Sequence, residues 1–175
     1  MRDLRSVLFP AAALALCGCA AMPPSTAAGS ADAVERGDNK SLVRDLTEVV
    51  WNRLGLDRIP EFYASDFVAD YRPYVPLREG HEGIRRMVEG AWAAFPDYHE
   101  ELHELNAEGD RVVVHLTISG TQRGQWGPLP PTGRRVQFEE IVILQIHDGK
   151  GRRQRGIADN LNALRQLGVV PSPPS

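Results

Sequence analysis

Apolar side chains recur at helical spacing in two stretches of the first half of the chain. Residues 40–54 carry one such stripe, with Asp38 or Asn39 as the expected N-cap. A second and cleaner stripe begins near Gly80 and ends before Pro96. Its members are Ile84, Met87, Val88, Ala91, Trp92 and Phe95. The spacing predicts an amphipathic helix over each stretch.

A short helix over residues 56–63 and a short strand over residues 67–71 are expected between these helices. In the second half, apolar and polar positions alternate, which is typical of strands that bury one face. The expected strands cover residues 98–106, 111–121, 136–146 and 152–158, and a last helical turn covers 161–167. Helices followed by an antiparallel run of strands predict an α+β fold. We expect a cone-shaped, curved antiparallel sheet wrapped around the N-terminal helices, with a pocket at its open end.

The first residues of the chain have a pattern of their own. Arg2 and Arg5 precede an apolar run over residues 7–16, far shorter than the about 20 residues that a membrane-spanning helix needs. A basic segment followed by such a run is typical of a secretory signal. The run ends in Leu16-Cys17-Gly18-Cys19, which resembles the lipobox of bacterial lipoproteins. The resemblance implies cleavage after residue 18 and lipidation of Cys19, which would anchor the protein to a membrane.

This leader divides the chain into four predicted parts. They are a signal peptide (1–18), a flexible tether (19–38), a folded domain (39–168) and a Pro/Ser tail (169–175). The alternative is an ordinary signal peptide cut at Ala20 or Ala21. In lipoproteins an Asp after the lipidated cysteine signals retention in the inner membrane, and this chain has Ala20 there. The expected location is therefore the bacterial cell envelope, at the outer membrane facing the periplasm.

Composition narrows the chemistry of the domain. Both cysteines lie in the leader, so no disulfide, cysteine nucleophile or cysteine metal site is expected in the folded part. A net charge of −3 and a single basic run, 152–155, argue against a nucleic-acid partner. The chain has no Gly-rich phosphate loop, no Gly-x-Ser-x-Gly elbow and no zinc motif. We expect no metal and no cofactor, and a hydrophobic small molecule as the partner.

One carboxylate interrupts the apolar face of the strand expected over residues 136–146. Glu140 shares that face with Val136, Phe138, Val142, Leu144 and Ile146. A buried carboxylate must be paired, protonated or beside a water-filled cavity, and each of these states perturbs its pKa. Glu140 is therefore a candidate acid or base. The alternatives are an ion pair with Arg153 or Arg155, or a place at the rim of the sheet.

The opposite face of the same strand is partly apolar. Its members are Gln137, Glu139, Ile141, Ile143 and Gln145. A strand that is apolar on both faces is unusual at a free surface, so this face is a candidate homodimer contact. His115 lies on the polar face of its own strand, which indicates a surface or interface residue rather than a catalytic one.

Short blocks along residues 40–168 resemble, in order, those of the SnoaL-like polyketide cyclases. The blocks are 61–68, 82–84, 95–97, 108–114, 120–124, 131–134, 147–150, Asp159 and 165–168. The resemblance implies the cone-shaped fold of the nuclear transport factor two superfamily. It also implies an intramolecular aldol ring closure without metal or cofactor. In that reaction a base removes a proton beside a carbonyl and an acid protonates the developing alkoxide.

The resemblance also locates the family's acid–base positions in this chain. Val142 stands where the cyclases have their histidine and Gly156 where they have their catalytic aspartate, and neither side chain transfers a proton. Glu140 matches a Gln or Glu position of the family's pocket. Asp159 matches the aspartate before the last helix, and Gln122 stands where many members have His.

Two hypotheses follow. The first is a cofactor-independent cyclase, isomerase or hydrolase with Glu140 as general base. Its further site candidates are Asp159 as the other catalytic residue and, for ligand binding, Tyr63, Asp70, Trp92, Gln122, Trp126 and Val142. For Trp92 the alternative is the helix core, and for Asp70 a solvated position. The second hypothesis is a lipoprotein that binds an apolar ligand or a protein partner in the pocket without turnover. Glu140→Gln separates them, because an enzyme fails with that change and a binder tolerates it.

Overall fold

The computed structural model describes residues 38–73 and 75–171 of the chain. The predicted signal peptide, the proposed lipid attachment at Cys19 and almost all of the tether lie outside the described residues, as does 172–175 of the tail. Within the described part, no helix combines the length and the apolar composition needed to cross a bilayer.

Four helical regions occur at the places where the apolar periodicity predicts them. Residues 38–46 form an α-helix that continues as the π-helical turn η1. The helical elements are η1 (Thr47–Asn52), η2 (Leu56–Arg58), α2 (Ile59–Phe62), α3 (Gly80–Ala94) and α4 (Asn160–Gln166). The first helix already includes Asp38 and Asn39, so neither is the N-cap that the sequence suggested. The side-chain amide of Asn39 instead donates to the carbonyl oxygen of Gly109, at 3.4 Å.

Six strands form one sheet, in the order β2-β1-β6-β5-β4-β3. They are β1 (Tyr63–Asp70), β2 (Arg78–Glu79), β3 (His99–Glu108), β4 (Arg111–Thr121), β5 (Arg135–His147) and β6 (Lys150–Ala158). The expected antiparallel run over the second half is confirmed in β3 to β6. The sheet as a whole is mixed, because β1 pairs in parallel with β6. A parallel pair needs a long crossover, and here α3 and four strands lie between its members.

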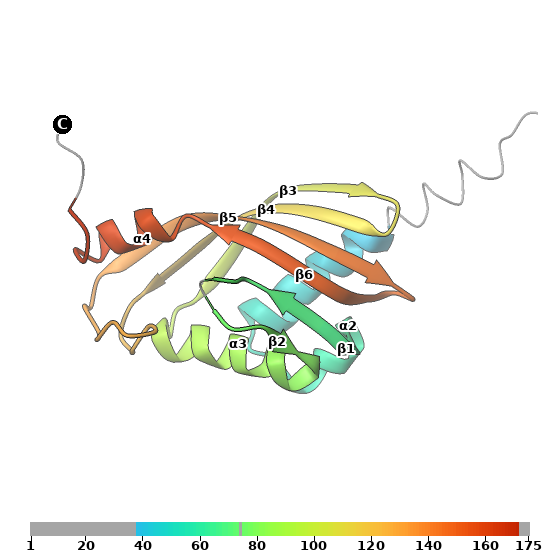
Figure 1. The fold of residues 1–175 in the computed structure, drawn as a ribbon, viewed down its shortest axis with the longest axis horizontal. Helices are drawn as coiled ribbons and strands as arrows, with labels where there is room; N and C mark the ends of the chain where they lie inside the picture. The colour runs from blue at the N-terminus through green and yellow to red at the C-terminus, as the bar shows by residue number, and fades with distance from the viewer. Residues whose placement is uncertain (1–37, 74, 172–175) are drawn as a thin grey trace, which may run out of the picture.

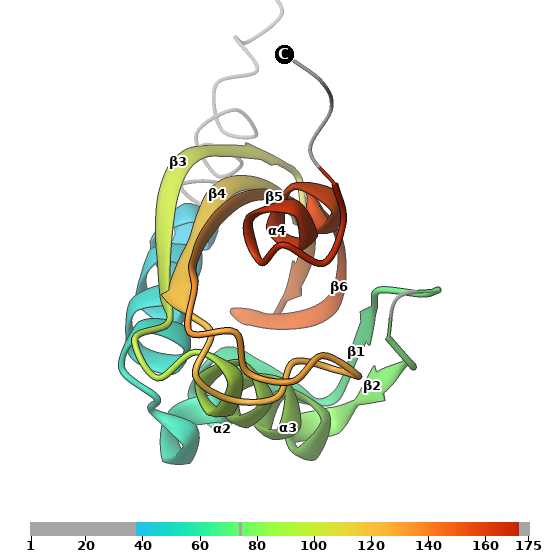
Figure 2. The same cartoon turned by 90° about the vertical axis from the view of Figure 1, so that its left-hand side faces the viewer.

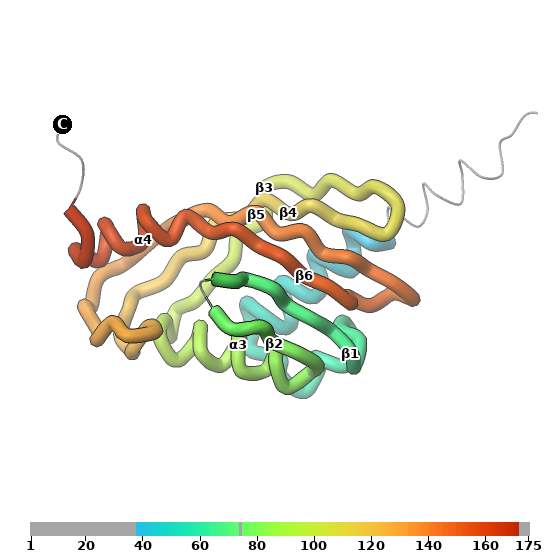
Figure 3. Tube along the Cα trace, viewed as in Figure 1, coloured from blue at the N-terminus to red at the C-terminus, as the bar shows by residue number. Residues whose placement is uncertain are grey.

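The sheet curls around the helices, as the sequence predicts. Seen from the end that carries α4, the strands bend into an open ring, with the N-terminal helix and α3 along the side left open (Figure 2). The side view shows α3 beneath the sheet and α4 beyond the end of β6 (Figures 1 and 3). Alternate residues of β4 and β5 are buried on the concave face. The resulting α+β cone leaves its concave side available for a pocket.

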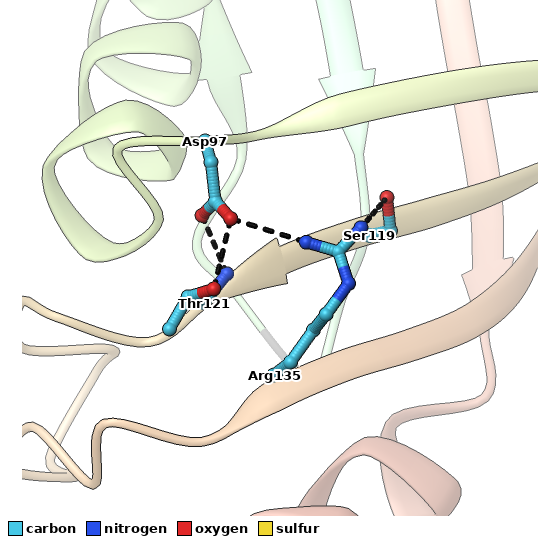
Figure 4. A network of polar contacts seen from close by, with 4 residues as sticks. All are labelled: Asp97, Ser119, Thr121 and Arg135. Carbon is cyan, nitrogen blue, oxygen red and sulfur yellow. Dashed lines mark hydrogen bonds and ion pairs between the residues drawn. The ribbon is translucent and has the colours of Figure 1, made fainter.

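One carboxylate fastens the turn after α3 to the ends of β4 and β5 (Figure 4). Asp97 accepts hydrogen bonds from the Thr121 backbone N–H at 2.6 Å and from the Thr121 hydroxyl at 2.8 Å. Arg135 forms an ion pair with Asp97 at 3.1 Å and donates to the Ser119 hydroxyl at 3.4 Å. The bond from the Thr121 backbone, followed by the other contacts, holds the pKa of Asp97 below its usual value. The network fixes the end of α3 against the sheet.

Candidate functional site

A cavity of about 760 Å³ occupies the concave side of the sheet. The inner faces of β4, β5 and β6 form one wall, and the N-terminal helix and α3 form the other. Some lining residues are exposed and mark the mouth, among them Val75, Gln125 and Pro128. Others, such as Val43 and Trp51 of the N-terminal helix, are buried. This volume suits a drug-sized organic molecule.

Two carboxylates lie inside this mostly apolar cavity. Glu140 on β5 and Glu100 on β3 both line it, and each is 8% exposed. In the strand register Glu100 is opposite Ile118 of β4, and Glu140 is opposite Leu116. A single strand therefore separates the two side chains on the concave face. Buried carboxylates without a cationic partner are typical of functional sites rather than of stabilising cores.

Glu140 has the environment of a general base. Burial raises its pKa to about 7, although a hydrogen bond with the Tyr71 side chain acts in the opposite direction. Its Oε1 atom is buried and has no hydrogen-bond partner among the described residues. The suggested ion pair with Arg153 or Arg155 is not formed, because both arginines alternate onto the outer face of β6 and are exposed. Glu140 therefore lines the cavity as a buried carboxyl group that no cation among the described residues pairs with.

Glu100 is a site residue that the sequence reasoning missed. The Tyr98 hydroxyl donates to its Oε1 at 2.6 Å, and the Asn52 side chain bonds both its backbone N–H and its carbonyl oxygen. Burial raises its pKa to about 8, and the nearby charge of Glu140 contributes to the rise. The available signal was the alternation of Tyr98, Glu100 and Leu102, which places this carboxylate on the buried face in the same way as Glu140.

Two more polar side chains connect with the carboxylates. Gln154 donates to the Tyr71 hydroxyl at 2.5 Å, and Tyr71 in turn is hydrogen-bonded to Glu140. Burial raises the pKa of Tyr71 and of Tyr98, and the neighbouring glutamates add to both shifts. These phenols therefore remain protonated and serve as hydrogen-bond donors across the neutral pH range.

Three of the predicted ligand-binding residues lie on the cavity wall. Tyr63 is fully buried there, and its hydroxyl accepts a hydrogen bond from the Trp51 indole at 3.0 Å. Trp126, in the loop between β4 and β5, contacts the rings of Phe95 and Phe138 at centroid distances of 5.5 and 6.1 Å. Val142 lines the wall beside Glu140. Their contact with a ligand stays a prediction.

Two predicted site carboxylates, Asp159 and Asp70, are not in the lining of the cavity. Asp159 is exposed and is the N-cap of α4, where its Oδ1 accepts from the Asn162 N–H at 3.0 Å. A capping carboxylate is held by the helix it caps, so Asp159 does not face a molecule in the cavity. Asp70 forms an ion pair with Arg72 at 2.7 Å, and this contact lowers the pKa of Asp70. Neither residue belongs to the lining.

Trp92 and Gln122 have structural positions in place of the expected ligand contacts. The Trp92 indole donates to the Trp51 carbonyl oxygen at 2.8 Å and packs against the core, which is the alternative that the sequence left open. Gln122 is fully buried outside the lining. Its amide donates to Pro130 O at 3.1 Å and accepts from the Thr132 hydroxyl at 2.7 Å, so it holds the loop that carries Trp126.

The two positions of the family's acid–base pair face each other across β5 and β6. Val142 and Gly156 are direct partners in the register. A side chain at position 156 would overlap Glu140 Oε1 and the ring of Tyr71. The missing side chain of Gly156 therefore makes room for the contact between Tyr71 and Glu140.

The outer surface of the sheet carries several exposed aliphatic side chains. Ile141, Ile143 and Ile157 are 44%, 43% and 67% exposed. His115 lies on the same face, 3.6 Å from Glu139. Association of two chains through this face stays a prediction. Across the described residues, no group of three or more His, Cys, Asp or Glu side chains is placed to hold a metal ion.

Comparison with known proteins agrees with this geometry. The family model of the SnoaL-like polyketide cyclases matches residues 41–167. The aklanonic acid methyl ester cyclase DnrD of Streptomyces peucetius is 32% identical over 129 residues, which cover 73% of this chain and 88% of the relative. The nogalonic acid methyl ester cyclase of Streptomyces nogalater is 29% identical over 114 residues, which cover 64% and 84%.

Solved structures support the same fold. A SnoaL-like polyketide cyclase from Jannaschia sp. CCS1 superposes with a TM-score of 0.70 at 22% identity, covering 78% of this chain and 95% of the other. TsrD from Streptomyces laurentii gives a TM-score of 0.70 at 27% identity, covering 77% and 98%.

Proposed function

This chain belongs to the SnoaL-like polyketide cyclase family, and we propose that it closes a ring in a hydrophobic carbonyl or ester compound by acid–base catalysis of its own side chains. The observation that carries the proposal is the Glu140 carboxyl group, buried in an apolar cavity without a cationic partner among the described residues. A base whose pKa lies near the working pH combines a large ionised fraction with a useful driving force for proton transfer.

The proposed reaction is an intramolecular aldol addition. The Glu140 carboxylate takes a proton from the carbon beside one carbonyl group, and the electron pair left on that carbon attacks a second carbonyl carbon of the same molecule. One C–C bond forms, the carbonyl π-bond opens to an alkoxide, and the alkoxide takes up a proton. The mostly apolar lining of the cavity strengthens the charge interactions in this step because it lowers the local dielectric constant.

The substrate class is proposed from the relatives and from the size of the cavity. Both curated relatives are named as cyclases of an acid methyl ester. A cavity of about 760 Å³ holds a molecule of several rings, and its apolar lining around a few polar groups suits a polyketide ester.

The test compares wild type with Glu140→Gln on two compounds. Aklanonic acid methyl ester tests the cyclisation itself. The small aromatic compound 5-nitrobenzisoxazole tests the base alone, because removal of its ring proton breaks the N–O bond and releases a coloured phenolate. We expect Glu140→Gln to lower both rates by at least about 100-fold, the usual contribution of a general base. The matched control is Glu139→Gln, whose side chain is the exposed neighbour on the outer face of β5.

The second candidate function is ligand binding without turnover. It is favoured by one observation, the pairing of Val142 with Gly156 where the family has its histidine and aspartate. In that case native mass spectrometry would find the same unaltered molecule on wild type and on Glu140→Gln, and neither test compound would be converted. Equal rates for wild type and Glu140→Gln would contradict the catalytic proposal.

We also propose that the domain works at a membrane of the cell envelope, tethered through a lipid on Cys19. The support is the sequence Leu16-Cys17-Gly18-Cys19 after an apolar run. Growth of the producing bacterium with an alkyne-tagged fatty acid should label the wild-type protein and leave Cys19→Ser unlabelled. Label on Cys19→Ser, or a soluble and unlabelled wild type, would contradict the anchor.

A further inference from the structure

The proposed ring closure needs a proton donor as well as a base. Glu140 can take the proton from carbon, but the alkoxide must then receive one. Asp159 is held as the cap of α4 outside the cavity. The lining tyrosines are poorer acids than a carboxyl group, and burial raises their pKa further. Among the described lining residues, Glu100 is the remaining acidic group.

The fold places Glu100 across the cavity wall from Glu140. Their strands, β3 and β5, flank β4 on either side, and both residues face the concave side. Neighbouring strands lie about 4.8 Å apart, and the two residues are also offset by two positions along β4, so their backbones are separated by roughly 12 Å. A molecule with two carbonyl groups can reach both carboxyl groups from this position.

The surroundings favour one retained proton on the two groups. Burial raises the pKa of both Glu140 and Glu100, and two carboxylates near one cavity resist simultaneous ionisation. Because Glu140 is the base of the proposed function, the retained proton belongs to Glu100. The Tyr98 hydroxyl is in direct contact with Glu100. The phenols of Tyr63 and Tyr71 and the carboxyl group of Glu140 lie near enough to interact with its charge. Arg78 and Arg86, the cations of the described lining, form no ion pair with it.

We propose that Glu100 is the acid that works with Glu140, giving its carboxyl proton to the substrate oxygen as Glu140 takes a proton from carbon. The inference rests on the proposed function of the same cavity. After the step Glu140 is protonated and Glu100 is a carboxylate. Passage of one proton from Glu140 to Glu100 through solvent in the cavity restores both groups, so the cycle consumes no other reagent. The Tyr98 hydroxyl, 2.6 Å from Glu100, stabilises the carboxylate while it lasts.

The first measurement is the infrared spectrum of the full chain at neutral pH. A protonated carboxyl group in apolar surroundings gives a separate C=O stretching band. Glu140, with a pKa of about 7, would also contribute to this band, so the comparison is made in a Glu140→Gln background. We expect the band in Glu140→Gln, its loss when Glu100→Gln is added, and its retention when Glu101→Gln is added, which removes the exposed neighbour on the outer face of β3. Absence of the band from Glu140→Gln at neutral pH, or its retention after Glu100→Gln is added, would overturn the proposal.

The second measurement tests donation to a bound oxygen. The probe is 2-acetylnaphthalene labelled with ¹³C at its carbonyl carbon, a neutral aromatic ketone of suitable size. A donor at Glu100 shifts the bound carbonyl stretch to lower wavenumber than in hydrocarbon solvent. We expect this shift to disappear in Glu100→Met, a non-donor of similar length, and to remain in Glu101→Gln. An unchanged shift in Glu100→Met would overturn the role of Glu100 as donor.

These readouts separate the inference from the proposed function. If Glu100 gives both infrared results while Glu140→Gln leaves the two reaction rates unchanged, the donor assignment stands and the catalytic proposal fails. If Glu140→Gln abolishes both rates while the infrared band survives Glu100→Gln, the base assignment stands and the donor assignment fails. Should Glu100→Met fail to fold, Glu100→Gln still decides through the band.

Discussion

A missing side chain at Gly156 explains how the cavity can hold Glu140 without a cation. In the register of β5 and β6, Gly156 lies opposite Val142, one inward-facing position along from Glu140. The space over Gly156 is filled by Glu140 Oε1 and by the ring of Tyr71. The tyrosine hydroxyl can then bond the carboxylate, and Gln154 bonds the tyrosine. The absence of a side chain at Gly156 therefore makes room for the hydrogen bonds of Tyr71 and Gln154 beside Glu140.

Gly156→Ala tests this arrangement at the scale of one methyl group. The added Cβ overlaps Glu140 and Tyr71, so both must move, and overpacking of this kind costs about 1–3 kcal/mol. We expect a lower free energy of unfolding in urea and slower deprotonation of 5-nitrobenzisoxazole. The control is Gly90→Ala on α3, where an added Cβ meets nothing within 4 Å and unfolding should be unaffected or harder. A Gly156→Ala protein as stable and as active as wild type would contradict the arrangement.

The elements that the sequence predicts best are those with strict periodicity. The helix α3 and the strand β4 match their expected bounds almost residue for residue, because one face of each is buried along its whole length. β3 is different. Its register with β4 shifts between Leu102 and Glu104, and beyond the shift Leu105 and Ala107 are only half-buried. The alternation is thus broken after Leu102, so the pattern of this strand does not single out Glu100 as a buried residue.

Connections between distant elements were less predictable than the elements themselves. The parallel pairing of β1 with β6 brings Tyr71, at the end of β1, over Gly156 and Glu140. No local pattern records that contact, because the residues are 69 or more positions apart. Asp159 shows the same limit. The resemblance to the family identified the residue, but only the structure shows that its carboxylate caps α4.

At the scale of the whole molecule, the cavity is an acidic interior assembled from every part of the fold. The N-terminal helix supplies Trp51, the residue after β1 supplies Tyr71, and β3, β5 and β6 supply Glu100, Glu140 and Gln154. The described residues place no cation in ion-pair contact with either glutamate. Stability and protonation are consequently linked, because folding must keep these carboxyl groups away from water.

This linkage predicts that the protein loses stability as pH rises through neutrality. An unfolded chain ionises both glutamates near pH 4.5, whereas the folded chain keeps their protons until pH passes about 7 for Glu140 and about 8 for Glu100. Across that window the folded state binds more protons than the unfolded state. The free energy of unfolding therefore falls with rising pH, by at most about 1.4 kcal/mol per pH unit for each glutamate. Below pH 4.5 both states are protonated, and this contribution is fully present.

Urea unfolding at steps between about pH 5 and about pH 9 measures this slope. The double variant Glu100→Gln/Glu140→Gln should show a flatter profile in that range, because an amide carries no proton to lose, while Glu101→Gln/Glu139→Gln should keep the wild-type slope. Carboxylates with lowered pKa values, such as Asp97, act in the opposite direction but titrate below this window. Stability that rose from pH 5 to pH 8 in wild type, or an equal slope in both double variants, would mean that the two glutamates do not hold their protons in the fold. The acid–base proposal for this cavity would then lose its physical basis.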